Sequence, residues 1–205
     1  MATTTQQPEE RDIAAFRNVF TFAVLAHVAD IITTHWRAPS LADEGNVVYQ
    51  FLARFGLGGW PYLISIKVVG VGVLAFAYSW YLTAREDYLP HRRVDSIRGL
   101  IWYSMWDGRE YPHSLWLRIF NRRELQFGAL VMAAIALPAS AVAALYYSVD
   151  NAFCALGHSL PSFALPVFVG VVTPTMFIWW CLAYRQYYEE QLRLGLVPDP
   201  GDGEE

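Results

Sequence analysis

Long runs of apolar residues divide the chain into four segments, each long enough to cross a bilayer as a helix. A helix that spans the hydrocarbon core needs about 20 mostly apolar residues. The runs cover residues 16–36, 60–82, 125–149 and 161–184, and each carries aromatic residues near its ends, as interfacial anchors do. The pattern predicts an all-α integral membrane protein with four transmembrane helices.

Polar segments separate and flank these spans. Residues 1–15 form a polar N-terminal segment, and residues 83–124 form a long loop between the second and third spans. Residues 185–205 first extend the fourth helix, which Gly195 ends, and then become an acidic tail rich in proline and glycine. We expect this tail to be disordered, because it holds too few apolar residues to pack.

Arginine is distributed unevenly between the loops. The 83–124 loop carries eight arginines, the first loop only Arg37 and Arg54, and the loop after the third span none. Because basic loops stay in the cytoplasm, the long loop and both termini are predicted to be cytoplasmic (N-in/C-in). The expected location is the inner membrane of a prokaryotic-type cell, crossed by a multi-pass chain.

Two loop segments are themselves amphipathic. Apolar residues at helical spacing in 47–55, closed by Gly56, predict a short helix on the outer surface. The inner loop mixes arginine with tryptophan, which is typical of a helix lying in the headgroup layer, although a docking surface for a second protein fits as well. The candidate lipid-facing or partner-facing residues of this loop are Arg92, Arg93, Arg98, Trp102, Trp106, Trp116, Arg118, Arg122 and Arg123.

Composition narrows the class further. The chain of 205 residues is 55% hydrophobic and only 17% charged, with a mean hydropathy of +0.24, whereas soluble domains carry about 25% charged residues. A net charge of −4 gives no reason to expect nucleic acid. Cys154 and Cys181 form no closely spaced pair, so neither a disulfide framework nor a zinc site is predicted.

Lys67 is the only lysine of the chain, and it lies inside the second span. A lone charge at this depth is costly, so it should face the helix bundle and be paired. Lys67 lies roughly 10 Å below the outer end of its span, and Asp30 lies roughly 9 Å below the outer end of the first span, at 1.5 Å per residue. Asp30 is also the only acidic residue within the four spans. We therefore predict an ion pair between Asp30 and Lys67.

Further polar residues lie at the same level of the predicted bundle. His27, Asp30 and Thr34 share one face of the first helix. The segment that opens the short outer helix can fold back over them. The predicted polar network, which binds a ligand or fixes the structure, consists of His27, Asp30, Thr33, Thr34, Glu44, Asn46 and Lys67.

The motifs D-I-I-T-T in the first span, E-G-N after a short loop and a lysine in the second span resemble the DUF5658-type family of small integral membrane proteins of unknown function. The resemblance covers about residues 20–75. The chain departs from the family pattern at Val47, where those proteins usually have proline. The resemblance implies that Asp30, Thr33, Thr34, Glu44, Asn46 and Lys67 act as a set, and it implies no activity.

Several functions remain compatible with this network. A buried ion pair can serve only to fix helix register. The same groups could instead bind a small ligand, an ion or a lipid, or take part in transport. Catalysis by Lys67 is disfavoured, because the neighbouring carboxylate keeps the amine protonated. We therefore expect no catalytic residue. No cofactor or metal site is required, and a single pigment or haem ligand at His27 stays open.

The leading functional hypothesis is a non-enzymatic accessory or scaffold subunit of a larger membrane complex. Its partners would be membrane lipids and other membrane subunits, or further copies of the same chain. Small residues at steps of three and four in the third span predict a close-packing face for such a contact. This face consists of Ala129, Ala133, Ala136, Ser140 and Ala144.

Overall fold

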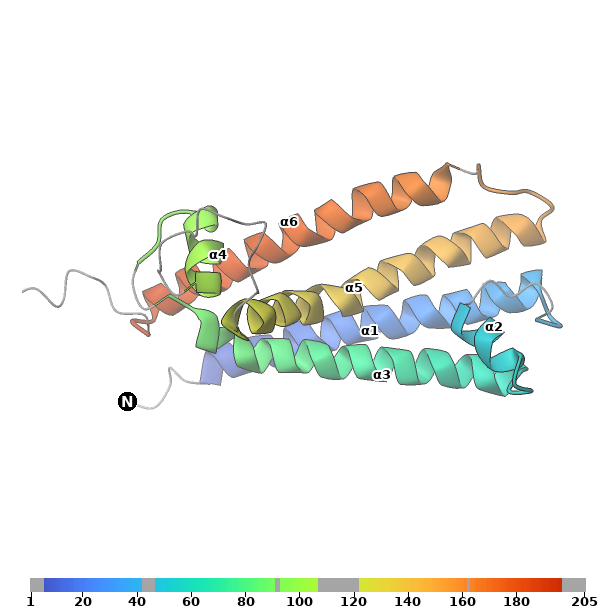
Figure 1. The fold of residues 1–205 in the computed structure, drawn as a ribbon, viewed down its shortest axis with the longest axis horizontal. Helices are drawn as coiled ribbons and strands as arrows, with labels where there is room; N and C mark the ends of the chain where they lie inside the picture. The colour runs from blue at the N-terminus through green and yellow to red at the C-terminus, as the bar shows by residue number, and fades with distance from the viewer. Residues whose placement is uncertain (1–5, 42–46, 91–92, 107–121, 162, 197–205) are drawn as a thin grey trace, which may run out of the picture. The chain divides into compact units, whose positions relative to one another are not determined.

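The computed structural model describes residues 6–41, 47–90, 93–106, 122–161 and 163–196, and every regular element in these ranges is helical. Figure 1 labels these elements. They are α1 (Gln6–Arg37), α2 (Val47–Ala53), α3 (Trp60–Ala84), the 3₁₀ helix η1 (Arg85–Tyr88), α4 (Ile97–Trp106), α5 (Arg122–Ala155) and α6 (Ala164–Arg193).

Four of the helices, α1, α3, α5 and α6, are long and apolar enough to cross a membrane. The predicted spans coincide with these helices, apart from a few residues before the start of α6, so the prediction of a four-helix, multi-pass membrane protein is confirmed at this level. The helices are longer than the apolar runs. α1 already begins at Gln6, and α6 continues to Arg193. Backbone hydrogen bonding carries a helix past the end of its apolar run, because polar side chains can point into water.

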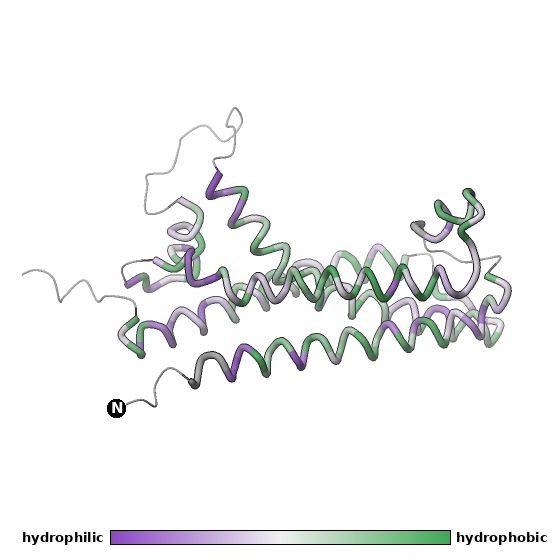
Figure 2. The backbone as a smooth tube through the Cα atoms, turned by 90° about the horizontal axis from the view of Figure 1, so that it is seen from below, coloured by the Kyte–Doolittle hydropathy of each residue, from purple (hydrophilic) through white to green (hydrophobic). Residues whose placement is uncertain are grey.

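Much of the apolar surface of these helices faces outward. In each of these helices we consider an apolar stretch of 18 residues. The share of this stretch that is buried within the protein is 17% in α1, 22% in α3, 39% in α5 and 11% in α6. Figure 2 shows apolar residues spread along all the long helices. Large exposed side chains such as Leu25, Val68 and Phe76 would be unfavourable in water, whereas lipid accepts them.

The chain forms two compact units. The first comprises Met1–Ser79 and Ala136–Val172, and the second comprises Trp80–Ile135 and Thr173–Glu205. In the first unit, α2 and the start of α3 pack through a small cluster of Leu41, Tyr49 and Leu63. The Tyr49 hydroxyl accepts a hydrogen bond from the Gly59 N–H at 2.9 Å. This contact fastens α2 to the beginning of α3.

The second unit is held by aromatic and hydroxyl contacts. Phe127 of α5 packs on Trp180 and Tyr184 of α6, with ring centroids 6.0 and 6.1 Å apart. Ser104 of α4 lies 3.0 Å from the Tyr184 hydroxyl, and both side chains are buried. Arg123 donates a hydrogen bond from Nε to the Ser104 carbonyl at 3.2 Å. These contacts tie α4 to α5 and α6.

Glycine ends α2 and α6 as predicted. Gly56 and Gly195 have positive φ angles of 78° and 69°, which glycine adopts without strain. After α2, the Gly56 N–H bonds to the Ala53 carbonyl and the Leu57 N–H to the Leu52 carbonyl. This pair of bonds is the Schellman motif, which satisfies carbonyls that the helix leaves open.

The buried face of α5 differs from the predicted small-residue face. Ala133 and Ala144 are buried, but Ala129 is exposed and Ala136 and Ser140 are only half-buried. The buried stripe also includes leucines, because burial follows the packing surface rather than side-chain size. It runs through Leu130, Ala134, Leu137, Ala141, Ala144, Ser148 and Asn151.

Candidate functional site

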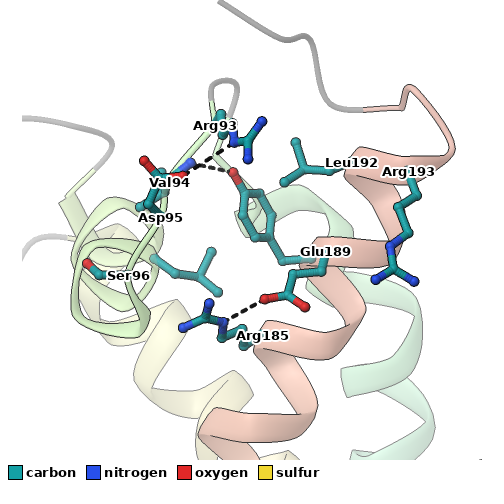
Figure 3. A pocket seen from close by; sticks show the side chains of 10 residues that line it. Arg93, Val94, Asp95, Ser96, Arg185, Glu189, Leu192 and Arg193 are labelled. Atoms are coloured by element: carbon teal, nitrogen blue, oxygen red, sulfur yellow. Dashed lines mark hydrogen bonds and ion pairs between the residues drawn. The ribbon is translucent and has the colours of Figure 1, made fainter.

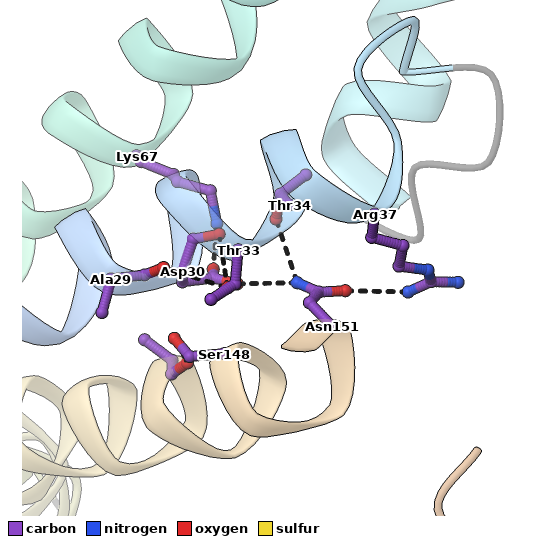
Figure 4. Close-up of polar contacts among 9 residues, drawn as sticks. Ala29, Asp30, Thr33, Thr34, Arg37, Lys67, Ser148 and Asn151 are labelled. Atoms are coloured by element: carbon purple, nitrogen blue, oxygen red, sulfur yellow. Dashed lines mark hydrogen bonds and ion pairs between the residues drawn. The ribbon is translucent and has the colours of Figure 1, made fainter. Parts of the chain in front are cut away.

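The predicted polar network lies in the first unit, where three helices contribute to it. Asp30 and Thr34 are one turn apart on α1, Lys67 lies on α3, and Asn151 lies near the end of α5 (Figure 4). Spacing of four residues places Asp30 and Thr34 on the same face of α1. Both are buried, as is Asn151. The site is therefore assembled from polar side chains on the inward faces of helices.

The predicted ion pair is present. Lys67 donates a hydrogen bond from Nζ to Oδ2 of Asp30, and the two side chains are only 10% and 7% exposed. The depth estimate placed the two charges at one level on adjacent helices, and this placement is correct. Each charge compensates the other, so neither is left alone among apolar residues.

Asn151 continues the network on its other side. Its Nδ2 donates hydrogen bonds to Oδ1 of Asp30 at 3.3 Å and to Oγ1 of Thr34 at 3.0 Å. Its Oδ1 accepts a hydrogen bond from Nη1 of Arg37 at 2.9 Å. The amide therefore points its N–H group at an anion and its carbonyl at a cation. Only this orientation of the amide satisfies all its partners.

Asn151 and Arg37 are members of the network that were not predicted from the sequence. The third span was predicted to end at residue 149, so Asn151 was assigned to a loop. In the structure α5 continues to Ala155. The missed signal is the spacing of Ala144, Ser148 and Asn151 by four and three residues, which continues the buried face of the helix.

Other predicted members take different positions. The Thr33 hydroxyl donates to carbonyls of its own helix, at 2.9 Å from Ala29 and 3.2 Å from Asp30. His27 lies near the ion pair, and within the described residues neither of its buried ring nitrogens has a hydrogen-bond partner. Glu44 and Asn46 lie outside the described residues. The structure thus joins Asp30 to Lys67 directly and to Thr34 through Asn151, whereas His27 remains outside these hydrogen bonds.

The predicted inner-loop residues belong to the second unit. Arg93 pairs with Asp95 at 3.3 Å on the surface, and Arg98 and Arg122 are exposed. Trp102 and Trp106 lie side by side on α4, with ring centroids 4.3 Å apart. Arg92, Trp116 and Arg118 lie outside the described residues. A short helix, α4, is present in this loop, and its position in the headgroup layer stays a prediction.

The chemistry open to the network follows from how its atoms are engaged. Both carboxylate oxygens of Asp30 accept hydrogen bonds, and the amine of Lys67 donates one of them. Within the described part of the chain, no three His, Cys, Asp or Glu side chains gather closely enough to hold a metal ion.

No protein-family model matches the chain, and neither a curated protein nor a solved structure matches it. The likeness to DUF5658-type membrane proteins therefore stays a prediction from the motifs around Asp30, Glu44 and Lys67.

Proposed function

We propose that the chain is a non-enzymatic accessory or scaffold subunit of a larger membrane complex. In this proposal the polar network holds the helices of the first unit in register. The observation that carries it is the complete engagement of Asp30, whose two oxygens bind Lys67 on α3 and Asn151 on α5. A buried polar network that satisfies its own groups specifies one helix arrangement, even where it adds little net stability.

The outward surface of α6 supports the scaffold role. Only 11% of an apolar 18-residue stretch of this helix is buried within the chain. Val167, Val169 and Val171 are exposed, and Gly170 has open space where a side chain would stand. Helices associate in membranes by close packing at small residues. Because the other helices of the chain bury so little of α6, its surface is available to a partner helix.

The proposed orientation places both termini and the loop after α3 in the cytoplasm of a prokaryotic-type cell. Its support is the arginine distribution, because residues 83–124 carry eight arginines and the loop between α5 and α6 carries none.

The test of the scaffold role is purification in mild detergent from the native membrane. We expect a second component at fixed stoichiometry, either another membrane subunit or a second copy of the chain. Gly170→Leu should reduce its recovery, because the leucine occupies the space a partner helix needs. Gly72→Leu on α3 is the matched control, since Gly72 is also exposed with open space around it. A monodisperse monomer without any second component would contradict the proposal.

A second candidate function is binding or transport of a small ligand, an ion or a lipid at Asp30, Thr34, Glu44, Asn46 and Lys67. The observation that favours it is His27, whose buried ring nitrogens lack a partner within the described residues. A buried polar group without a partner is costly, so a bound molecule could supply the missing hydrogen bonds.

His27→Leu separates the two functions. If the network only fixes the helices, the variant should be as stable as the wild type or more stable, because an unpaired polar group is removed. If a ligand binds there, the purified variant should lose it, and the stability that the ligand confers is lost with it. A visible absorption band that disappears in the variant would identify the ligand as a pigment or haem.

A further inference from the structure

The second unit contains a cavity of about 360 Å³ between the segment that precedes α4 and the end of α6 (Figure 3). The buried Tyr188 holds the two sides together, because its hydroxyl accepts a hydrogen bond from the Val94 N–H at 2.7 Å. Ser96 caps α4 by accepting a hydrogen bond from the Gly99 N–H at 3.0 Å. The volume lies within the range of small-ligand pockets. These hydrogen bonds fix the positions of the segments that form the walls of the cavity.

Three arginines line this cavity. Arg93 comes from the segment before α4, and Arg185 and Arg193 come from α6. Arg93 and Arg185 each use Nε in an ion pair, with Asp95 at 3.3 Å and Glu189 at 2.7 Å. A guanidinium has five N–H donors, so further donors remain on both side chains. The lining carries three positive and two negative charges, which favours an anion.

The two acidic partners hold the arginines only weakly. The side chains of Arg185 and Glu189 are 40% and 45% exposed, and those of Arg93 and Asp95 are more exposed still. Ion pairs at such exposure contribute little, because water competes for both charges. An incoming phosphate can therefore replace the carboxylates at little cost, and it offers oxygens that match the fork of arginine donors.

The position of the cavity indicates the source of the anion. Arg185 directly follows the apolar run of residues 161–184, which places this end of the cavity at the level where a membrane carries its headgroups. A second cavity of about 560 Å³ adjoins it at Ser96 and is lined by Arg98 and Trp102. Tryptophan beside arginine suits the boundary between phosphate and acyl chain.

We infer that the cavity lined by Arg93, Arg185 and Arg193 binds a phosphate-bearing anion, and that membrane phospholipid supplies it. This inference goes beyond the scaffold role, because it concerns the second unit and does not depend on the Asp30–Lys67 network. It also differs from a general attraction of the inner loop to lipid, since two of the three arginines belong to α6.

The experiment is a lipid titration of the purified full-length protein, followed by native mass spectrometry. The probes are dioleoylphosphatidylglycerol, dioleoylphosphatidylcholine and inorganic phosphate. We expect one anionic lipid to bind with saturation. Arg93→Gln with Arg193→Gln should weaken this binding about tenfold or more. The matched control removes two exposed charges from the first unit, Arg17→Gln with Arg54→Gln, and should leave the binding unchanged.

Glu189→Gln gives a result that misfolding cannot imitate. The substitution removes the carboxylate that competes for Arg185, so phosphatidylglycerol should bind about threefold more tightly. Competition by inorganic phosphate at equal concentration would support the site but identify a soluble phosphate as its ligand. Equal binding of both lipids, or binding that neither of the two cavity variants changes, would overturn the inference.

Discussion

At the scale of single residues, the side-chain amide of Asn151 connects the acidic and basic groups of the network. Its N–H group faces Asp30 and its carbonyl faces Arg37, so its dipole lies between an anion and a cation. Such an amide cannot be reversed without placing donor against donor. Asn151 therefore links the Asp30–Lys67 ion pair to Arg37.

The first prediction concerns the ion pair. Lys67→Met leaves the Asp30 carboxylate buried without its counter-ion, so it should lower the free energy of unfolding by about 3 kcal/mol. Asp30→Asn should have a similar effect. The double variant should lose much less than the sum of the two, because neither buried charge remains unpaired. Thermal unfolding in detergent measures all three proteins. Additive losses would mean that the two residues do not interact.

Exchanging the charges gives a second prediction. Asp30→Lys with Lys67→Asp restores opposite charges, but Asn151 then points its N–H group at a cation while Arg37 holds its carbonyl. We therefore expect the exchanged protein to regain only part of the stability lost in the single variants. Recovery to the wild-type melting temperature would show that the Asn151 contacts contribute nothing to the fold.

A third prediction isolates Asn151. Replacing Asn151 by alanine removes hydrogen bonds to Asp30, Thr34 and Arg37, and should cost about 1–2 kcal/mol. Ser148→Ala is the matched control, because Ser148 is equally buried on α5 but its hydroxyl bonds only to the Ala144 carbonyl of its own helix. Guanidinium or heat denaturation should therefore separate the two variants. Equal losses would contradict the role assigned to the amide.

The Asp30–Lys67 ion pair could be predicted from the sequence because few charged residues lie within the spans. One lysine and one acidic residue within the spans left a single pairing, and helix rise matched their depths. Prediction from the sequence failed for Asn151, because the side chain lies 121 positions from Asp30 in the chain. The direction in which Asn151 points from α5 also depends on Pro138 in the same helix, because a proline kinks a helix. Polar residues without charge are also common enough in loops to give no signal of their own.

At the scale of elements, hydropathy located the membrane helices but not their buried faces. α5 contains apolar residues on every side, so composition alone could not tell which stripe packs against other helices. The structure assigns burial to Ala141 and exposure to Ala129. Small residues on a membrane helix can serve either internal packing or association, and only the fold distinguishes the two.

The fourth prediction uses this contrast. Ala141→Leu introduces a large side chain at a fully buried position, and overpacking should lower the free energy of unfolding by about 1–3 kcal/mol. Ala129→Leu should leave it almost unchanged. Differential scanning fluorimetry in detergent compares them. If Ala129→Leu instead changes the oligomeric state without loss of stability, the exposed part of the predicted face contacts another helix.

At the scale of the whole molecule, four long apolar helices indicate a multi-pass membrane protein, whereas its orientation is a prediction from the arginine distribution alone. The orientation is a fifth prediction. In a Cys154→Ser, Cys181→Ser background, a cysteine at Ser159 should react with a membrane-impermeant maleimide in intact cells. A cysteine at Glu10 should react only after the cells are opened. The reverse pattern would place the termini outside.

The single lysine has a practical consequence. A lysine-specific endoproteinase has one cleavage site in this sequence, after Lys67, where the side chain is buried against α1. Cleavage therefore requires the part of α3 around Lys67 to leave α1, unfold and reach water, and two fragments report that event. The rate of their appearance in detergent measures how often this part of the helix pair opens, without an added label.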